Sequence, residues 1–155
     1  MKLNIHVTIR EATEGDLEQM VHMLADDVLG RKRERYEKPL PVSYVRAFKE
    51  IKKDKNNELI VACNGEEIVG MLQVTFTPYL TYQGSWRATI EGVRTHSAAR
   101  GQGIGSQLVC WAIERAKERG CHLIQLTTDK QRPDALRFYE QLGFKASHEG
   151  LKMHF

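Results

Sequence analysis

The chain of 155 residues has few of the features that mark several large classes of protein. It contains only three cysteines, Cys63, Cys110 and Cys121, and an odd, widely spaced set argues against a disulfide framework. Such a set fits the reducing cytoplasm. No stretch approaches the ~20 consecutive apolar residues of a membrane-spanning helix. Polar residues interrupt the apolar ones in positions 1–6, so we expect no signal peptide and a cytoplasmic location.

Charge of one sign is scarce as well. The net charge of +3 is too small to indicate nucleic-acid binding by itself. Four basic residues do lie close together: Arg31, Lys32, Arg33 and Arg35. No set of stacking aromatic residues accompanies them. They form either a solvated helix end or a basic wall for an anionic ligand. We therefore expect neither a nucleic-acid nor a membrane partner.

Spacings typical of metal sites are also missing. The sequence has six histidines, at positions 6, 22, 96, 122, 148 and 154. No pair of them has convincing ligand spacing with cysteines or carboxylates, so we expect no metal. His96 follows a predicted strand, where it either assists proton transfer or packs in a turn.

The pattern of apolar residues predicts a single domain over residues 1–155 with alternating types of element. The predicted order is a strand at 5–9, helices at 17–28 and 42–53, strands at 59–63, 68–77 and 86–95, a helix at 103–118, a strand at 122–128, a helix beginning at Pro133, and one or two final strands in 144–155. This order indicates a mixed sheet with helices packed on it.

Local signals support several of these boundaries. Thr13 and Asp16 resemble a capping box at a helix start, with Asp in place of the usual Glu. Asn64-Gly65 is a hairpin signal between two apolar runs. Glycines at 120 and 143 are typical residues for ending a helix.

The segment Arg100-Gly101-Gln102-Gly103-Ile104-Gly105 is the most informative one, because it follows a strand and opens a helix. Its glycines permit close approach of a ligand, and the first amides of a helix bind phosphate. A P-loop would need a lysine before Ser106, and a dinucleotide fingerprint would need glycine at that position. A glycine-rich helix start that binds nothing remains the alternative.

The pattern Arg100-x-x-Gly103-x-Gly105 resembles the acyl-CoA pyrophosphate motif of the GNAT superfamily of N-acetyltransferases. The run from Ala135 to Phe144, which contains Phe138-Tyr139, is similar to that family's A-x-x-F-Y-x-x-x-G-F segment. The resemblance implies an α/β (α+β) fold with a mixed, mainly antiparallel sheet of six to seven strands. About four helices would flank the sheet, and its fourth and fifth strands would splay apart.

The resemblance also implies where acetyl-CoA, the acetyl donor, binds. Pantetheine would bond to the backbone of the fourth strand, at about Val93, Arg94 and Thr95. The pyrophosphate would rest on the amides of Arg100, Gly101, Gln102, Gly103, Ile104, Gly105 and Ser106. The sequence departs from the family at Arg132, where an Asn often supplies a further contact to pantetheine.

Acetyl transfer to an amine needs a base, an oxyanion donor and stabilisation of the departing thiolate. Glu91 is our candidate base, acting through water, because strand alternation puts it on one face with Val93 and Thr95. The alternative is a charged residue on an exposed face. Tyr139 matches the family tyrosine that meets the CoA sulfur and is our candidate acid; otherwise it is a packed aromatic residue.

The remaining expectations concern the reaction as a whole. An amide near Val93 or Arg94 would hold the oxyanion, and transfer would be direct, since neither Cys110 nor Cys121 is well placed for a covalent intermediate. In this family the acceptor pocket would comprise about residues 24–44 and 79–86. The acceptor would be a small-molecule amine. The alternatives are a protein or peptide acceptor, or a non-catalytic acyl-CoA-binding module; a homodimer is possible.

Overall fold

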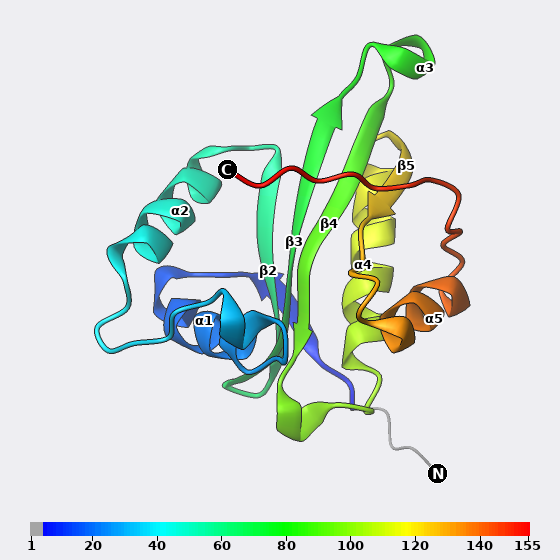
Figure 1. The fold of residues 1–155 in the computed structure, drawn as a ribbon. Coiled ribbons are helices and arrows are strands. Elements are labelled where there is room, and N and C mark those ends of the chain that lie inside the picture. The colour runs from blue at the N-terminus through cyan, green and yellow to red at the C-terminus, as the bar shows by residue number, and fades with distance from the viewer. Residues whose placement is uncertain (1–4) are drawn as a thin grey trace.

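A computed structural model describes residues 5–155, so residues 1–4 of the segment in which we expect no signal peptide lie outside it. One sheet holds five strands in the order β1-β2-β3-β4-β5 (Figure 1). They are β1 (Thr8–Glu11), β2 (Asn57–Asn64), β3 (Glu67–Pro78), β4 (Trp86–Thr95) and β5 (Cys121–Leu126). The first four strands pair antiparallel, and β5 runs parallel to β4.

Helices cover both faces of the sheet. They are α1 (Leu17–Ala25), α2 (Val42–Lys53), α4 (Ile104–Glu118) and α5 (Pro133–Gln141), joined by 3-10 turns at Glu14–Asp16, Gly30–Lys32 and Ser97–Ala99. Figure 1 shows α1 and α2 on one side of β3 and β4 and α4 and α5 on the other. The segment α3 (Thr81–Gly84) is a tight turn, since Tyr82 and Gln83 have φ angles of +52° and +61°.

The hydrophobic core has two layers that follow these faces. One lies between the sheet and α4, where the stripe predicted for that helix is buried, including Leu108 and Ala112. The other lies under α1 and α2 and contains Met20, Phe48 and Met71. Strand alternation separates the layers, because neighbouring residues of β3 such as Met71 and Leu72 point to opposite faces.

A glycine in β3 sets how closely the start of α4 approaches the sheet. A Cβ atom at Gly70 would lie 2.9 Å from side-chain carbons of Ile104 and Leu108, closer than real Cβ contacts. The absent side chain therefore lets the first turn of α4 sit directly on the sheet. This contact fixes the position of the glycine-rich turn that precedes the helix.

The sequence predicted most elements well. The bounds of α2 and β4 agree with the prediction, and Asp16 completes the predicted capping box by accepting a hydrogen bond from the Thr13 amide at 2.7 Å. The first helix is shorter than expected. It ends at Ala25, and Val28, assigned to its buried stripe, is 70% exposed.

The expected six to seven strands are wrong for the described residues, which form five. Residues 144–155 form no strand, although Leu151, Met153 and Phe155 alternate with polar residues as strand residues do. All three side chains are largely exposed, and Figure 1 shows this segment crossing in front of the sheet. Alternation alone produces no strand without a neighbouring edge to bond to.

Candidate active site

The site is built around the place where β4 and β5 part. Their parallel pairing runs from Trp86 and Cys121 to Ile90 and Leu126. There β5 ends, whereas β4 continues to Thr95. The edge of β4 from Glu91 onward is therefore not paired with β5, which confirms the predicted splay of the fourth and fifth strands. Its backbone amides and carbonyls are available to an extended ligand.

A β-bulge at Gly92 interrupts β4 on this free edge. Glu91 pairs with Gln73 and Arg94 pairs with Met71, so three residue steps on β4 match two on β3. Gly92 is the extra residue, and its φ of +62° lies in the left-handed region that favours glycine. Because Gln73 and Met71 share a face of β3, their partners Glu91 and Arg94 share that face on β4.

The bulge makes the expected facing of Glu91 wrong. Met71 belongs to the core under α1 and α2, so Glu91 and Arg94 face that side of the sheet. Val93 packs against the opposite core, and the Thr95 hydroxyl lies 3.8 Å from the position of a Cβ at Gly105, in α4. Glu91 thus lies across the strand from Val93 and Thr95.

The glycine-rich turn adopts the geometry of an anion site. Gly101 and Gly103 have φ angles of +77° and +79°, and Gly103 directly precedes α4. The first helical bond of this turn is donated by the Gln107 amide to the Gly103 carbonyl at 3.1 Å. The amides of the preceding helical residues therefore have no acceptor one turn earlier and point out of the helix start, where they favour a phosphate.

Tyr139 lies in α5 beside this split. Its ring packs edge-to-face on Phe138 and Phe144, with ring centroids 5.0 and 5.9 Å away. Burial raises the pKa of the Tyr139 hydroxyl above its usual range, and the positive charges of Arg94 and Arg132 partly oppose this shift. The hydroxyl therefore keeps its proton at neutral pH, as a donor to a departing thiolate must.

The Glu91 side chain is exposed and forms no hydrogen bond or ion pair with any other of residues 5–155. Its position fits a base that works through water, because the carboxylate is free to contact solvent. Glu91 and Tyr139 come from different elements, β4 and α5.

An ionic network that the sequence did not reveal bridges the mouth of the split. Arg132, which precedes α5, donates two hydrogen bonds to the Asp27 carboxylate at 2.7 and 2.5 Å. The Gly30 amide donates to the same carboxylate at 2.8 Å, and an Arg94 nitrogen lies 3.8 Å from it. Arg100 donates to the Asp26 carbonyl at 3.1 Å.

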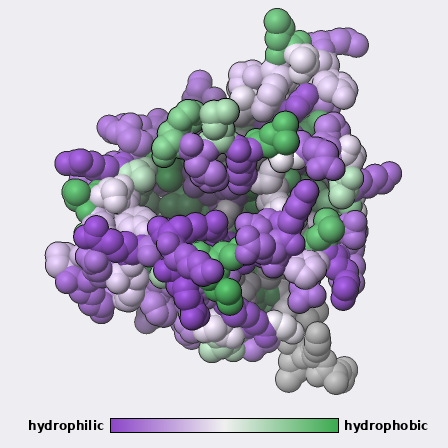
Figure 2. All heavy atoms as spheres, in the orientation of Figure 1, coloured by the Kyte–Doolittle hydropathy of each residue, from purple (hydrophilic) through white to green (hydrophobic). Residues whose placement is uncertain are grey.

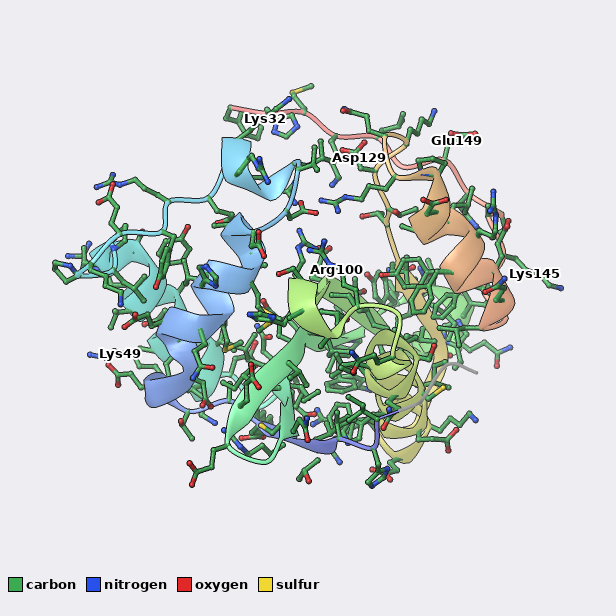
Figure 3. The ribbon with its side chains drawn as sticks, turned by 90° about the horizontal axis from the view of Figure 1, so that it is seen from below. Lys32, Lys49, Arg100, Asp129, Lys145 and Glu149 are labelled. Carbon is green, nitrogen blue, oxygen red and sulfur yellow. The ribbon has the colours of Figure 1, made fainter. Side chains whose placement is uncertain are left out.

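This network connects the segment after α1 to the loop before α5. Figure 3 views the molecule from below, with Lys32 on the segment after α1, Asp129 on the loop before α5 and Arg100 nearer the centre. Arg132 stands at the position where the family often has an Asn that contacts pantetheine. In this chain the Arg132 side chain donates hydrogen bonds to Asp27. The sequence marked Arg132 only as a departure from the family pattern and gave no sign of its partner Asp27.

We expect Asp27→Asn to lower the free energy of unfolding by about 1–3 kcal/mol at pH 7, because two guanidinium groups lose a partly buried partner. The hydrogen bonds from Arg132 hold the pKa of Asp27 well below its usual range. Because the pKa of Asp27 is lower in the folded than in the unfolded protein, its charge stabilises the fold at pH values above the unfolded pKa of about 3.9. This stabilisation is lost progressively as the pH falls below 3.9 towards the folded-state pKa.

Urea unfolding at pH 7 and pH 3 measures this effect. The deficit of Asp27→Asn relative to the wild type should shrink at pH 3, whereas Glu66→Gln, an exposed control in the β2–β3 turn, should match the wild type at both. An equal deficit at both pH values would show that the carboxylate charge contributes nothing.

The two segments of the expected acceptor pocket, residues 24–44 and 79–86, do not meet. The segment 79–85 forms the tip of the β3–β4 hairpin, at the opposite end of β4 from the glycine-rich turn (Figure 1). The ten residues of β4 separate the hairpin tip from the glycine-rich turn by roughly 30 Å. Instead, Arg87 stacks on Tyr79 at 4.3 Å from the ring centroid, so these aromatic residues hold the hairpin tip together.

Other surface features carry less chemistry. Arg35 in the basic cluster is exposed and paired with Glu37 at 2.7 Å, as expected for a solvated segment. A hollow of about 300 Å³ lies between β2 and α4, where Glu58 and Arg115 form an ion pair, away from the split. Figure 2 shows a mostly hydrophilic face with a central recess that has hydrophobic atoms at its floor.

Two further findings concern absences. Within residues 5–155, no helix is both long enough and apolar enough to cross a bilayer. The same residues contain no group of three or more histidine, cysteine, aspartate or glutamate side chains arranged to hold a metal ion.

Comparison with known proteins identifies several relatives. A model of the acetyltransferase (GNAT) family matches residues 25–144. An aminoalkylphosphonate N-acetyltransferase of Salmonella typhimurium is 38% identical over 95 residues, 61% of each chain. An L-methionine sulfoximine/L-methionine sulfone acetyltransferase of Pseudomonas aeruginosa is 25% identical over 142 residues, covering 90% of this chain and 81% of that one.

Among solved structures, a putative acetyltransferase from Agrobacterium tumefaciens is similar with a TM-score of 0.84 and 26% identity. The similarity covers 96% of this chain and 99% of that one. The chain spans about 60% of the length of two of the curated relatives that it matches.

Proposed function

This chain belongs to the acetyltransferase (GNAT) family, and on this premise we propose that it transfers the acetyl group of acetyl-CoA to a primary amine of a small molecule. The observation that supports this most is the unpaired edge of β4, which is followed by the glycine-rich turn and the start of α4. An extended donor can bond to that edge while its phosphates meet the helix amides. Two relatives are named for small amine substrates, which supports an acceptor of that size.

The residues present fit acetyl-CoA, which supplies an acetyl thioester when bound. Val93 and Thr95 offer backbone groups on the free edge, and the missing side chain of Gly105 lets Thr95 and Phe138 lie close to the first turn of α4. An amide near Val93 or Arg94 would hold the oxyanion of the acyl-transfer transition state.

The chain's own side chains would complete the reaction. Glu91, on the α1 and α2 side of β4, would take the ammonium proton through water, since only the free amine is nucleophilic. Tyr139, on the α5 side, would donate a hydrogen bond to the departing sulfur. Its raised pKa lies above that of a thiol, about 8.5, so hydrogen bonding is favoured over complete proton transfer. Attack would be direct, in a ternary complex.

A thiol-release assay with acetyl-CoA tests this function. The acceptors are simple amines, polyamines, aminophosphonates and peptides, and mass spectrometry identifies the acetylated product. We expect turnover with a small amine. Turnover with peptides alone would identify a peptide acetyltransferase. CoA binding without turnover on any acceptor would identify a binding module.

We expect Gly105→Val to weaken CoA binding at least tenfold, roughly the effect of inserting bulk into a filled site. A Cβ at this position would already lie 3.3 Å from the Phe138 ring, so the two additional methyl groups must enter the path between β4 and α5. Calorimetry with CoA measures the change.

Cys110→Val is the matched control, because Cys110 is exposed on the same helix and away from its start. It should bind CoA as the wild type does. A Gly105→Val protein with normal melting temperature and normal CoA affinity would remove this binding path.

A further inference from the structure

The ionic network at the mouth of the split has more positive than negative charge. Arg94 and Arg132 share one carboxylate, that of Asp27, which binds Arg132 closely and stays 3.8 Å from Arg94. Arg94 forms no other ion pair among residues 5–155. Arg33 lies close enough for its charge to lower the pKa of Arg94 further. A guanidinium group is therefore left without a close anionic partner.

Burial makes this incomplete pairing costly. Only 15% of the Arg94 side chain is exposed, and its Nε is buried without a hydrogen-bond partner in the structure. One terminal nitrogen donates at 2.8 Å to the carbonyl of the preceding residue, Val93. Burial is also the main cause that lowers the pKa of Arg94. An unpaired buried cation destabilises a protein unless another group compensates it.

The position of Arg94 points to the acceptor rather than to the donor. The bulge at Gly92 places the Arg94 side chain on the face of β4 that carries Glu91, towards α1 and α2. The helix start that would bind the donor phosphates lies with Thr95 and Gly105 on the other side. Arg94 also lies near enough to Tyr139 for the two groups to influence each other's pKa.

We propose that Arg94, with Arg132 beside it, binds an oxyanion group of the acceptor, so the acceptor is a short amine that carries a carboxylate, phosphate or phosphonate. This inference rests on the proposed function and specifies its substrate class. A guanidinium group matches two oxygens of such an anion at once and suits a partly buried site better than an ammonium group does. When no acceptor is bound, Asp27 neutralises part of this positive charge, and the anionic group of the acceptor neutralises the rest.

Acceptors that differ in whether they carry an anionic group test the proposal. One pair is 2-aminoethylphosphonate and propylamine; another is 3-aminopropionate and its amide. For the wild type we expect the charged member of at least one pair to have a kcat/KM at least tenfold higher. Arg94→Gln should reduce that preference about tenfold or more, mainly through KM, in line with the loss of a charge-assisted hydrogen bond. The two pairs together distinguish a phosphonate from a carboxylate site.

Arg46→Gln is the matched control, because it removes an exposed arginine of α2 and changes the net charge equally. It should keep the wild-type preference. A wild type that uses neutral and charged amines equally well would overturn the proposal. So would an Arg94→Gln enzyme that retains the full preference, or one that loses it no more than Arg46→Gln does.

A binding measurement separates this proposal from the proposed function. Calorimetry of the CoA-bound protein with methylphosphonate and with propionate, which lack an amine, needs no turnover. Binding of either anion that Arg94→Gln weakens tenfold supports the subsite even if no amine is acetylated. Absence of Arg94-dependent binding of both anions overturns it even if acetylation occurs. The melting temperature of unliganded Arg94→Gln should not fall, because the substitution removes a poorly paired buried charge; a large fall would assign Arg94 to the structure instead.

Discussion

Replacing Tyr139 with phenylalanine should lower kcat roughly 10²-fold, near the low end of the range for general acid assistance. The departing thiolate has a pKa of about 8.5 and leaves fairly well unaided, so the hydroxyl helps without being indispensable. Phenylalanine keeps the ring and its packing on Phe138 and Phe144. Acetyl-CoA affinity and melting temperature should therefore change little.

Single-turnover kinetics should accompany the steady-state assay, because they report the chemical step. Tyr82→Phe is the matched control: Tyr82 is exposed at the tip of the β3–β4 hairpin, far from the glycine-rich turn, so the loss of its hydroxyl should leave single-turnover rates unaltered. Full turnover by Tyr139→Phe, with chemistry shown to be rate-limiting, would leave Tyr139 as a packing residue.

The second large effect is expected for Glu91→Gln, where kcat/KM for the amine should fall roughly 10²-fold near neutral pH. A primary ammonium group has a pKa of about 10.4, so little free amine is present at neutral pH and proton removal limits the reaction. As pH rises towards that value, solvent supplies the free amine and the need for a base declines. The gap between Glu91→Gln and the wild type should therefore narrow.

Rates measured from pH 6 to pH 10 check this prediction, and calorimetry should show unchanged CoA affinity. Glu67→Gln, an exposed glutamate of β3, is a suitable control and should follow the wild-type profile. A Glu91→Gln profile that parallels the wild type at every pH would make another residue, or bulk water alone, the base.

The sequence predicted what depends on local pattern. The apolar stripe of α4, the bounds of β4 and the glycine-rich turn all follow from residues close together in the chain. The Asp27–Arg132 pair could not be predicted in this way, since 105 positions separate the partners. The prediction of strands in segment 144–155 was wrong for a related reason. The strand-like alternation of that segment does not reveal whether a free edge of the sheet is available to it.

The predicted facing of Glu91 was wrong because of a single residue, Gly92. Simple alternation from Glu91 to Thr95 holds only if each residue of β4 pairs with one residue of β3, and Gly92 breaks this rule. A glycine in a strand is compatible with a bulge but also with an ordinary pair. The candidate residues themselves were identified from the sequence, whereas the side of the strand on which Glu91 lies required the structure.

The bulge also determines which changes a descendant of this sequence can survive. No atom lies within 4 Å of a Cβ at Gly92, so replacement there costs only the left-handed conformation, roughly 1 kcal/mol and less for asparagine. Deleting Gly92 would make the pairing regular, and it would leave Glu91 opposite Gln73 and Arg94 opposite Met71, on the same face as before. In an alignment of evolved variants, position 92 should therefore vary in residue type or be missing, while Glu91 and Arg94 stay on one face of the sheet.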